Sequence, residues 1–232
     1  WTKRYGWGSS DIPLCSWDGV LCGSGHASDD EGVTELDLEK FQLDGDIPTS
    51  LYQLPTLKEV NLRYNYDAII SFEGIGNAAN LEVMRLSEII VDSLDGIGQA
   101  TKLRRLHLTG CDLWGNFPDE IFDLASTLKQ LFIAYNDFTG PLPTKLGQMK
   151  HLTDFFAYDN SFTGTVPTEL GNMKSLKNIV LAENLLSGQL PSELSTLPSL
   201  QLFSIFRRNK VGPKLTGTLP TFASAPQLTD LY

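Results

Sequence analysis

A phrase that recurs every 24 residues constrains the fold of this chain more than any other feature. It reads LKQLFIAYNDFTGPLP at residues 128–143, LTDFFAYDNSFTGTVP at residues 152–167 and LKNIVLAENLLSGQLP at residues 176–191. The shared frame is Leu-x-x-Leu-x-Leu-x-x-Asn, followed by Gly-x-x-Pro. A fixed period of this length indicates stacked structural units, each of which adds to one continuous core.

Each position of the frame has a physical role. The alternating leucines predict a short strand whose leucine side chains point inward, and stacked strands form a parallel sheet. The Asn amide can donate and accept hydrogen bonds to the backbone where the strand ends. Gly permits a tight bend and Pro stops further pairing, so the remainder of each unit is expected to form a short helical turn. The Asn position is held by Asn65, Asn136, Asn160 and Asn184, with Cys111 in the same position of another unit.

Counting by this frame divides the chain into a cap and an array. The cap covers residues 1–32, and the array covers residues 33–232 as eight repeats and the start of a ninth. The eighth repeat carries an insertion at residues 207–214. The short segment 228–232 opens a further repeat, so we expect either that the natural chain continues or that a partner covers this open end in an assembly.

Two motifs carry a resemblance to a known family. The segment CSWDGVLC at residues 15–22 resembles the N-terminal cap of plant-type extracellular leucine-rich-repeat proteins, and segments such as LDGDIP at residues 43–48 resemble their repeats. This group includes receptor-kinase ectodomains and polygalacturonase inhibitors. The resemblance implies an α/β repeat fold: a right-handed leucine-rich-repeat solenoid with a parallel concave β-sheet and short convex helical turns. It also implies an extracellular or cell-surface location, reached through the secretory pathway. The second and third repeats lack the Gly-x-x-Pro half.

The cysteines predict one disulfide. Cys15 and Cys22 are close in sequence and flank Trp17, so we expect a bond that staples the cap and contributes about 2 to 3 kcal/mol. The rival interpretation is a pair of metal ligands, but no second Cys or His pair lies at zinc spacing. Cys111 is expected to be a small buried residue.

Composition and motifs argue against several function classes. The net charge of −10 argues against general nucleic-acid binding, which depends on Lys and Arg neutralising phosphates. No run of about 18 apolar residues is present to span a membrane. The sequence holds no Gly-x-Ser-x-Gly, P-loop or His-Glu-x-x-His motif, and His26, His107 and His151 fall in unrelated contexts. We therefore predict no enzyme activity, cofactor or metal.

The outward strand positions are the candidate binding site. In the first four repeats they are charged, and in the last four they are aromatic or apolar. The candidate residues are Arg63, Tyr64, Arg85, Arg105, Phe132, Tyr135, Phe156, Tyr158 and Phe206. Exposed aromatic and Arg residues are enriched at interface hot spots. Two alternatives stay open: the rings stack only to stabilise neighbouring repeats, and the arginines pair with Glu35, Glu39, Glu59 or Glu88.

These observations favour an extracellular recognition module that binds a protein or peptide, or a cell-wall polysaccharide, on its concave face. In this hypothesis the aromatic residues anchor the partner and the arginines orient an acidic group. One alternative is a structural subunit of a larger extracellular assembly, favoured by the open last repeat and by the absence of any Asn-x-Ser/Thr sequon. A further alternative, from resemblance alone, is an inhibitor of a wall-degrading hydrolase.

Overall fold

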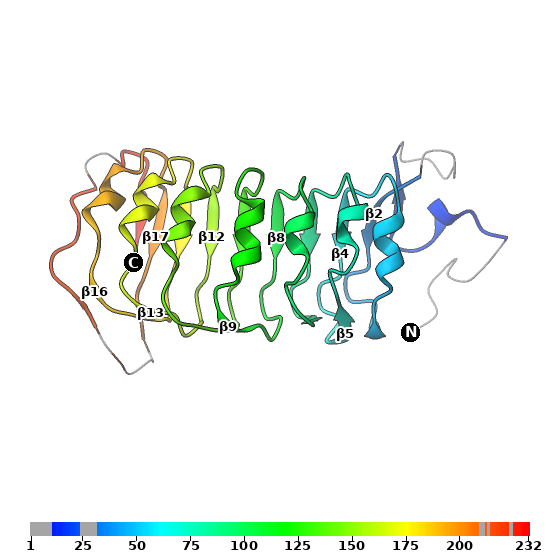
Figure 1. Cartoon of the computed structure of the whole chain (residues 1–232), viewed down its shortest axis with the longest axis horizontal. Helices are drawn as coiled ribbons and strands as arrows, with labels where there is room; N and C mark the ends of the chain where they lie inside the picture. Colours follow the sequence, from blue (N-terminus) through cyan, green and yellow to red (C-terminus); the bar gives the residue numbers. More distant parts are fainter. Residues whose placement is uncertain (1–10, 24–31, 209–211, 213, 223–224) are drawn as a thin grey trace. The chain divides into compact units, whose positions relative to one another are not determined.

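The computed structural model describes residues 11–23, 32–208, 212, 214–222 and 225–232 (Figure 1). It forms two compact units: unit 1 ends at Cys111 and unit 2 begins at Asp112. His26 and residues 209–211 and 213 of the insertion lie outside the described residues, as do residues 1–10 and 24–31 of the expected cap. The cap boundary expected after residue 32 stays a prediction.

Unit 1 is built on one main sheet whose repeated strands are parallel. The main sheet contains β1 (Val20–Cys22), β2 (Val33–Asp37), β4 (Glu59–Asn61), β6 (Val83–Arg85) and β8 (Arg105–His107). β1 pairs antiparallel with β2, and the later strands pair in parallel. A second sheet contains β3 (Asp44–Asp46), β5 (Asp67–Ile70) and β7 (Ile90–Val91). The short 3-10 turns are η1 (Leu14–Ser16), η3 (Thr49–Gln53), η4 (Ile75–Asn77) and η5 (Ile97–Gln99).

Unit 2 repeats the same plan. Its main-sheet strands are β10 (Gln130–Phe132), β12 (Asp154–Phe156), β14 (Asn178–Val180), β17 (Leu202–Ser204) and β19 (Asp230–Leu231), all parallel. The small lateral strands are β9 (Trp114–Asn116), β11 (Asp137–Thr139), β13 (Thr163–Gly164), β15 (Leu185–Leu186), β16 (Gly188–Gln189) and β18 (Leu215–Thr216). The turns are η6 (Asp119–Leu124), η7 (Thr144–Gln148), η8 (Thr168–Asn172) and η9 (Ser192–Thr196). The expected leucine-rich-repeat solenoid, with parallel strands and short turns, is confirmed.

Alternation along each strand fixes which side chains reach the surface. In β10 the side chain of Leu131 is fully buried, whereas Gln130 and Phe132 are partly exposed. β12 and β14 show the same order of one buried residue between two partly exposed ones. Successive side chains of a strand point to opposite faces, so every main strand offers outward positions that the core does not use.

The Asn ladder forms as the sequence predicts. Asn160 donates from Nδ2 to the carbonyl of Ile133 (2.9 Å), and its Oδ1 accepts from the N–H of Phe138 (3.0 Å). Asn65 and Asn184 make the equivalent bonds one repeat away from their own strands. The Cys111 thiol donates to the carbonyl of Leu86 (2.9 Å), so it replaces the donor part of the ladder. These bonds satisfy backbone groups that burial would otherwise leave without partners.

Proline and glycine set the turns between strands. Pro143 and Pro167 precede η7 and η8, and the carbonyl of each accepts the N–H three residues later. The fixed φ of proline suits this first position and its missing N–H is not needed there. In η7, a Cβ added at Gly147 would lie 2.5 Å from the carbonyl oxygen of Glu169 in the next repeat. Close packing of neighbouring turns therefore requires glycine at that position.

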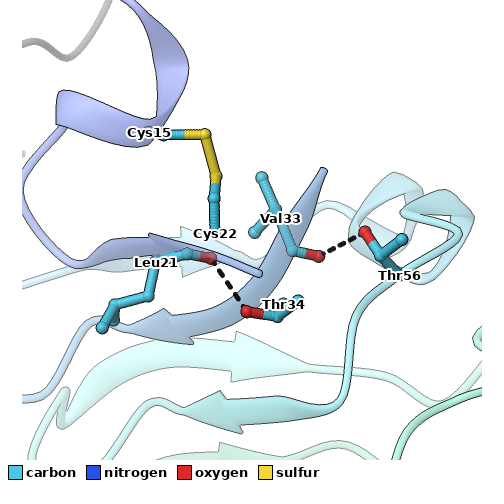
Figure 2. The surroundings of a disulfide bond; sticks show 6 residues. All are labelled: Cys15, Leu21, Cys22, Val33, Thr34 and Thr56. Carbon is cyan, nitrogen blue, oxygen red and sulfur yellow. Dashed lines mark hydrogen bonds between the residues drawn. A yellow bond between two sulfur atoms is a disulfide. The ribbon is translucent and has the colours of Figure 1, made fainter. Parts of the chain in front are cut away.

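The disulfide closes the start of unit 1. Cys15 in η1 is bonded to Cys22 at the end of β1, with their Cα atoms 5.7 Å apart (Figure 2). The Thr34 hydroxyl donates to the carbonyl of Leu21 (3.3 Å), which ties β1 to β2. Gly19 has φ +78°, and a Cβ there would lie 2.3 Å from the Asp37 carbonyl oxygen. The motif thus combines a covalent link with a glycine that lets β1 approach the first repeat.

Candidate functional site

The outward side of each main sheet, here called its strand face, contains the candidate residues. In unit 2 the parallel register places Phe132 beside Phe156, and Phe156 beside Val180. The rings of Phe132 and Phe156 are 4.6 Å apart between centroids and tilted by 57°. Both residues are half-buried. This pair forms a continuous apolar patch on β10 and β12.

A second aromatic pair lies two to three residues further along these repeats. Tyr135 and Tyr158 come from adjacent repeats, and their rings meet edge-to-face with centroids 5.0 Å apart. The N–H of Tyr135 donates to the carbonyl of Tyr158 (3.0 Å). Tyr135 has φ +53° and remains 54% exposed, so its ring lies at the surface. The left-handed backbone is uncommon for a residue with a bulky side chain, and the ladder bonds that follow hold it in place.

Tyr158 is less exposed than Tyr135, and its surroundings disfavour the phenolate. Burial raises the pKa of the Tyr158 hydroxyl, and the nearby Tyr135 and Asp159 raise that pKa further. The repeat places Asp159 directly after Tyr158, in the left-handed position before the ladder residue Asn160. The hydroxyl of Tyr158 is therefore neutral, and a carboxylate lies close to it.

Phe206 lies further along the same face and has a different environment. The guanidinium of Arg208 lies over the Phe206 ring, 4.9 Å from its centroid. Beside it, a cavity of about 450 Å³ is lined in part by Asn184, Arg207 and Lys214. Arg207 donates to the carbonyls of Asn184 and Gly212, both at 3.4 Å. No ring contact joins Phe206 to the tyrosine pair among the described residues, so Phe206 is a separate part of the strand face.

The strand face of unit 1 is charged, and two of its candidate arginines are paired. Arg63 forms an ion pair with Glu39 of the preceding repeat. Arg85 forms one with Glu59. From the sequence alone, these arginines could either face a partner or pair with glutamates. In the structure Arg63 and Arg85 are paired within unit 1.

Glu39 lies in a network of polar side chains in unit 1. Burial favours its protonated form, and hydrogen bonds from Asn61 and Arg63 oppose this effect. With the charges of Arg63 and Lys40, they lower the pKa of Glu39 below its ordinary value of 4.5. Tyr64, also left-handed with φ +60°, has Lys40 at 5.0 Å and Arg63 at 5.9 Å from its ring centroid. The ring of Tyr64 therefore already has two cations from its own chain near its face.

Arg105 differs from the other two arginines. It is exposed at the start of β8, and no ion pair is recorded for it in the described part of unit 1. The register aligns Arg105 with Val83 and aligns Arg85 with His107, so these two arginines lie in different rows of the sheet. The three arginines do not gather into one cluster.

Comparison with known proteins agrees with this architecture. The Leucine Rich Repeat family model matches residues 102–124. The ectodomain of the Arabidopsis thaliana receptor kinase GASSHO1/SCHENGEN3, solved in complex with CASPARIAN STRIP INTEGRITY FACTOR 2, is 28% identical. It superposes with a TM-score of 0.83 over 97% of this chain and 26% of its own. The chain has a leucine-rich-repeat fold and is similar to plant leucine-rich-repeat receptor ectodomains.

Two further matches show the same similarity. The leucine-rich-repeat chain is 29% identical over 136 residues to Receptor-like protein 49 of Arabidopsis thaliana, and the match covers 58% of this chain and 14% of that protein. The Arabidopsis HAESA ectodomain, solved with an IDA peptide hormone ligand, is 28% identical with a TM-score of 0.65. That match covers 85% of this chain and 37% of the other. The leucine-rich-repeat chain thus spans much less than half the length of these proteins.

No second kind of site emerges from the described residues of this leucine-rich-repeat protein. No group of three His, Cys, Asp or Glu side chains in that part of the chain could hold a metal ion. Likewise, no helix described in the structure has the length and apolarity to cross a bilayer. His107 belongs to unit 1 and His151 to unit 2.

Sequence reasoning named Glu39 and Glu59 among the partners of the arginines but left the pairing open, and it missed the contact of Arg208 with Phe206. Glu39 and Arg63 are 24 residues apart, as are Asp154 and Asn178, whose side chains also bond. A polar residue with a complementary residue one period later is therefore the signal that predicts pairing across strands. The Arg208–Phe206 contact has no such signal, because the insertion interrupts the period.

Proposed function

We propose that this chain is an extracellular recognition module that binds a protein or peptide on the strand face of unit 2. The observation that carries the proposal is the outward-facing Phe132–Phe156 and Tyr135–Tyr158 pairs, which the fold does not need for its core. Large rigid rings offer much contact area at low entropic cost, and aromatic residues are enriched at interface hot spots. Phe206 adds a separate apolar contact beside its cavity.

The similar proteins support the class of ligand. Both receptor ectodomains described above were solved with a bound partner, and one of these is a peptide hormone. The disulfide of the cap supports an oxidising compartment, because such bonds persist mainly in secreted or surface proteins. A peptide or protein met outside the cell is therefore the proposed partner.

Unit 1 has a secondary part in the proposal. Arg63, Tyr64, Arg85 and Arg105 would orient an acidic group of a partner. Arg105 is the strongest of these candidates because it is exposed and has no recorded ion pair among the described residues. Arg63 and Arg85 would first have to leave Glu39 and Glu59, which reduces their net attraction for a ligand.

A displayed peptide library tests the proposal even though the natural ligand is unidentified. Peptides are selected on the disulfide-bonded chain, and the affinity of each selected peptide is then measured for the Phe156→Ala/Tyr158→Ala variant. We expect loss of binding with little change in melting temperature. The matched control is Tyr66→Ala/Trp114→Ala, which removes two aromatic residues that are 62% and 82% exposed away from the strand faces.

The opposite result would support the alternative role of the rings. If the Phe156→Ala/Tyr158→Ala variant binds selected peptides unchanged and melts at a lower temperature, the rings serve to stack adjacent repeats. Selected peptides that lose affinity only for the control variant would place recognition elsewhere on the chain.

A further inference from the structure

Two partly exposed aromatic rings on the strand faces hold a cation from the chain itself. Lys40 and Arg63 lie over Tyr64 in unit 1, and Arg208 lies over Phe206 in unit 2. The negative face of an aromatic ring attracts a cation within about 6 Å of its centroid. These contacts show that rings on the strand faces already accept ammonium and guanidinium groups.

Tyr135 is the exception at an equivalent position. Tyr64 and Tyr135 each precede a ladder asparagine and both have positive φ, 60° and 53°. Arg63 precedes Tyr64, whereas Ala134 precedes Tyr135 and cannot supply a charge. Across the described residues, no cation–π contact is recorded on Tyr135 or on Tyr158. The more exposed of these two rings is 54% accessible to a partner.

The charges beside the tyrosine pair favour a positive group. Asp159 lies close enough to Tyr158 for its charge to act on the Tyr158 hydroxyl. Glu183 follows in the same row of the next repeat, where its Oε1 accepts the N–H of Arg208 (2.9 Å). The charge of Asp159 would repel a partner carboxylate at the tyrosines and attract an ammonium or guanidinium group. Glu183 contributes less, because it already bonds Arg208, whose guanidinium lies over the Phe206 ring.

The Phe132–Phe156 pair lies next to the Tyr135–Tyr158 pair on the strand face. Phe156 and Tyr158 are both outward residues of one extended segment, so their Cα atoms are separated by roughly 7 Å. Side chains two residues apart on one face of an extended peptide have about the same separation. The surface therefore matches an apolar side chain and a cationic side chain separated by one residue.

We propose that Tyr135, Tyr158 and Asp159 bind a cationic side chain of a partner peptide whose neighbouring apolar side chain lies on Phe132 and Phe156. The inference rests on the proposed function, because it names the partner class for that recognition surface. The occupant is a basic and apolar peptide segment. An acidic segment is disfavoured at this surface.

Three small probes of similar shape test the charge preference directly. These are 2-phenylethylammonium, 2-phenylethanol and 3-phenylpropionate, titrated separately into ¹⁵N-labelled protein while amide chemical shifts are followed. We expect the ammonium probe to shift resonances around Phe132, Tyr135 and Tyr158 and to bind about two- to fivefold more tightly than the alcohol. The carboxylate should bind most weakly. Raising the salt to about 0.5 M should reduce the difference between the probes.

Matched variants then test the assigned residues. Tyr135→Leu, Tyr158→Leu and Asp159→Asn should each reduce the preference for ammonium over alcohol. The controls Tyr66→Leu and Asp137→Asn remove an exposed tyrosine and an exposed carboxylate away from the strand face, and they should leave the preference intact. Melting temperatures of all variants verify that they are folded.

The outcomes separate this inference from the proposed function. If ammonium and alcohol bind the aromatic patch equally well, the cation site is wrong while an apolar recognition surface stands. If no probe shifts the patch, or the carboxylate binds best, the cation site is also wrong. Peptide selection with Phe156→Ala/Tyr158→Ala decides the proposed function independently.

Discussion

The strand faces of the two units use the same frame for different chemistry. In unit 1 the outward side chains are charged and bond to one another across repeats, as Glu39 does with Arg63 and Glu59 with Arg85. In unit 2 they also include two aromatic pairs that meet ring to ring, with 54% of Tyr135 exposed. The frame fixes the backbone and the core, whereas the outward positions are free to vary. Charged groups that are already ion-paired within the chain have a weaker net attraction for a partner.

Breaking the shared frame should have the largest effect, and it should be equal in both units. Asn65→Ala and Asn160→Ala each leave several buried backbone groups without a bond, so each should lower the free energy of unfolding by about 3 kcal/mol. Urea denaturation measures the change. The control Asn172→Ala removes an exposed amide and should cost less than about 0.5 kcal/mol. A large difference between Asn65→Ala and Asn160→Ala would contradict a common frame.

The next largest effect should come from removing outward side chains, which should weaken peptide binding in unit 2 but not in unit 1. Phe156→Ala/Tyr158→Ala should weaken a selected peptide by about 2 kcal/mol or more, which is roughly thirtyfold. The counterpart in unit 1, Arg63→Ala/Arg85→Ala, should change that affinity by less than about 0.5 kcal/mol because these arginines are paired within the unit. Isothermal titration calorimetry compares them. Equal losses in the two variants would show that recognition is not confined to unit 2.

Stability should distinguish paired from unpaired arginines within unit 1. Arg85 and Glu59 have side chains only 24% and 20% exposed, so Arg85→Ala should destabilise the fold by about 1 kcal/mol. Arg105→Ala removes an exposed cation and should change stability by less than about 0.5 kcal/mol. Thermal denaturation provides the measurement. If Arg105→Ala is the more destabilising variant, Arg105 has a structural partner.

The smallest expected effect is a pH dependence specific to unit 1. The folded-state pKa of Glu39 is lowered, so its charged form stabilises the fold. That contribution is complete above the ordinary value of 4.5 and is lost as the pH falls through the lowered pKa. Glu39→Gln should therefore reduce the loss of stability on acidification below about pH 5. The exposed carboxylate of Glu73 offers the control Glu73→Gln, and a similar change in both variants would argue against the network around Glu39.

Much of the fold follows from the sequence because the repeat fixes neighbours. The strand positions, the Asn160 ladder and the Cys15–Cys22 disulfide were all predictable from local patterns. The period also implies that residues one repeat apart lie side by side, so the Glu39–Arg63 pair could be found from its spacing.

The remaining details depend on geometry that the pattern does not contain. Tyr135 combines a left-handed backbone, set by the turn before the ladder residue, with an exposed ring, whereas Tyr64 has the same backbone and a partly buried ring. Arg208, which contacts Phe206, lies in the insertion, where the repeat period no longer predicts neighbours. Whether Phe132 and Phe156 bind a partner or only stack also cannot be read from spacing, because both roles require the same rings.

Aromatic ¹³C NMR of the protein labelled at Phe and Tyr, with and without a library-selected peptide, tests the central claim most directly. Recognition by the strand face of unit 2 predicts shifts of the ring signals of Phe132, Tyr135, Phe156 and Tyr158, while Tyr64 in unit 1 stays unchanged. Shifts of Tyr64 with no change at the four rings of unit 2 would contradict the claim.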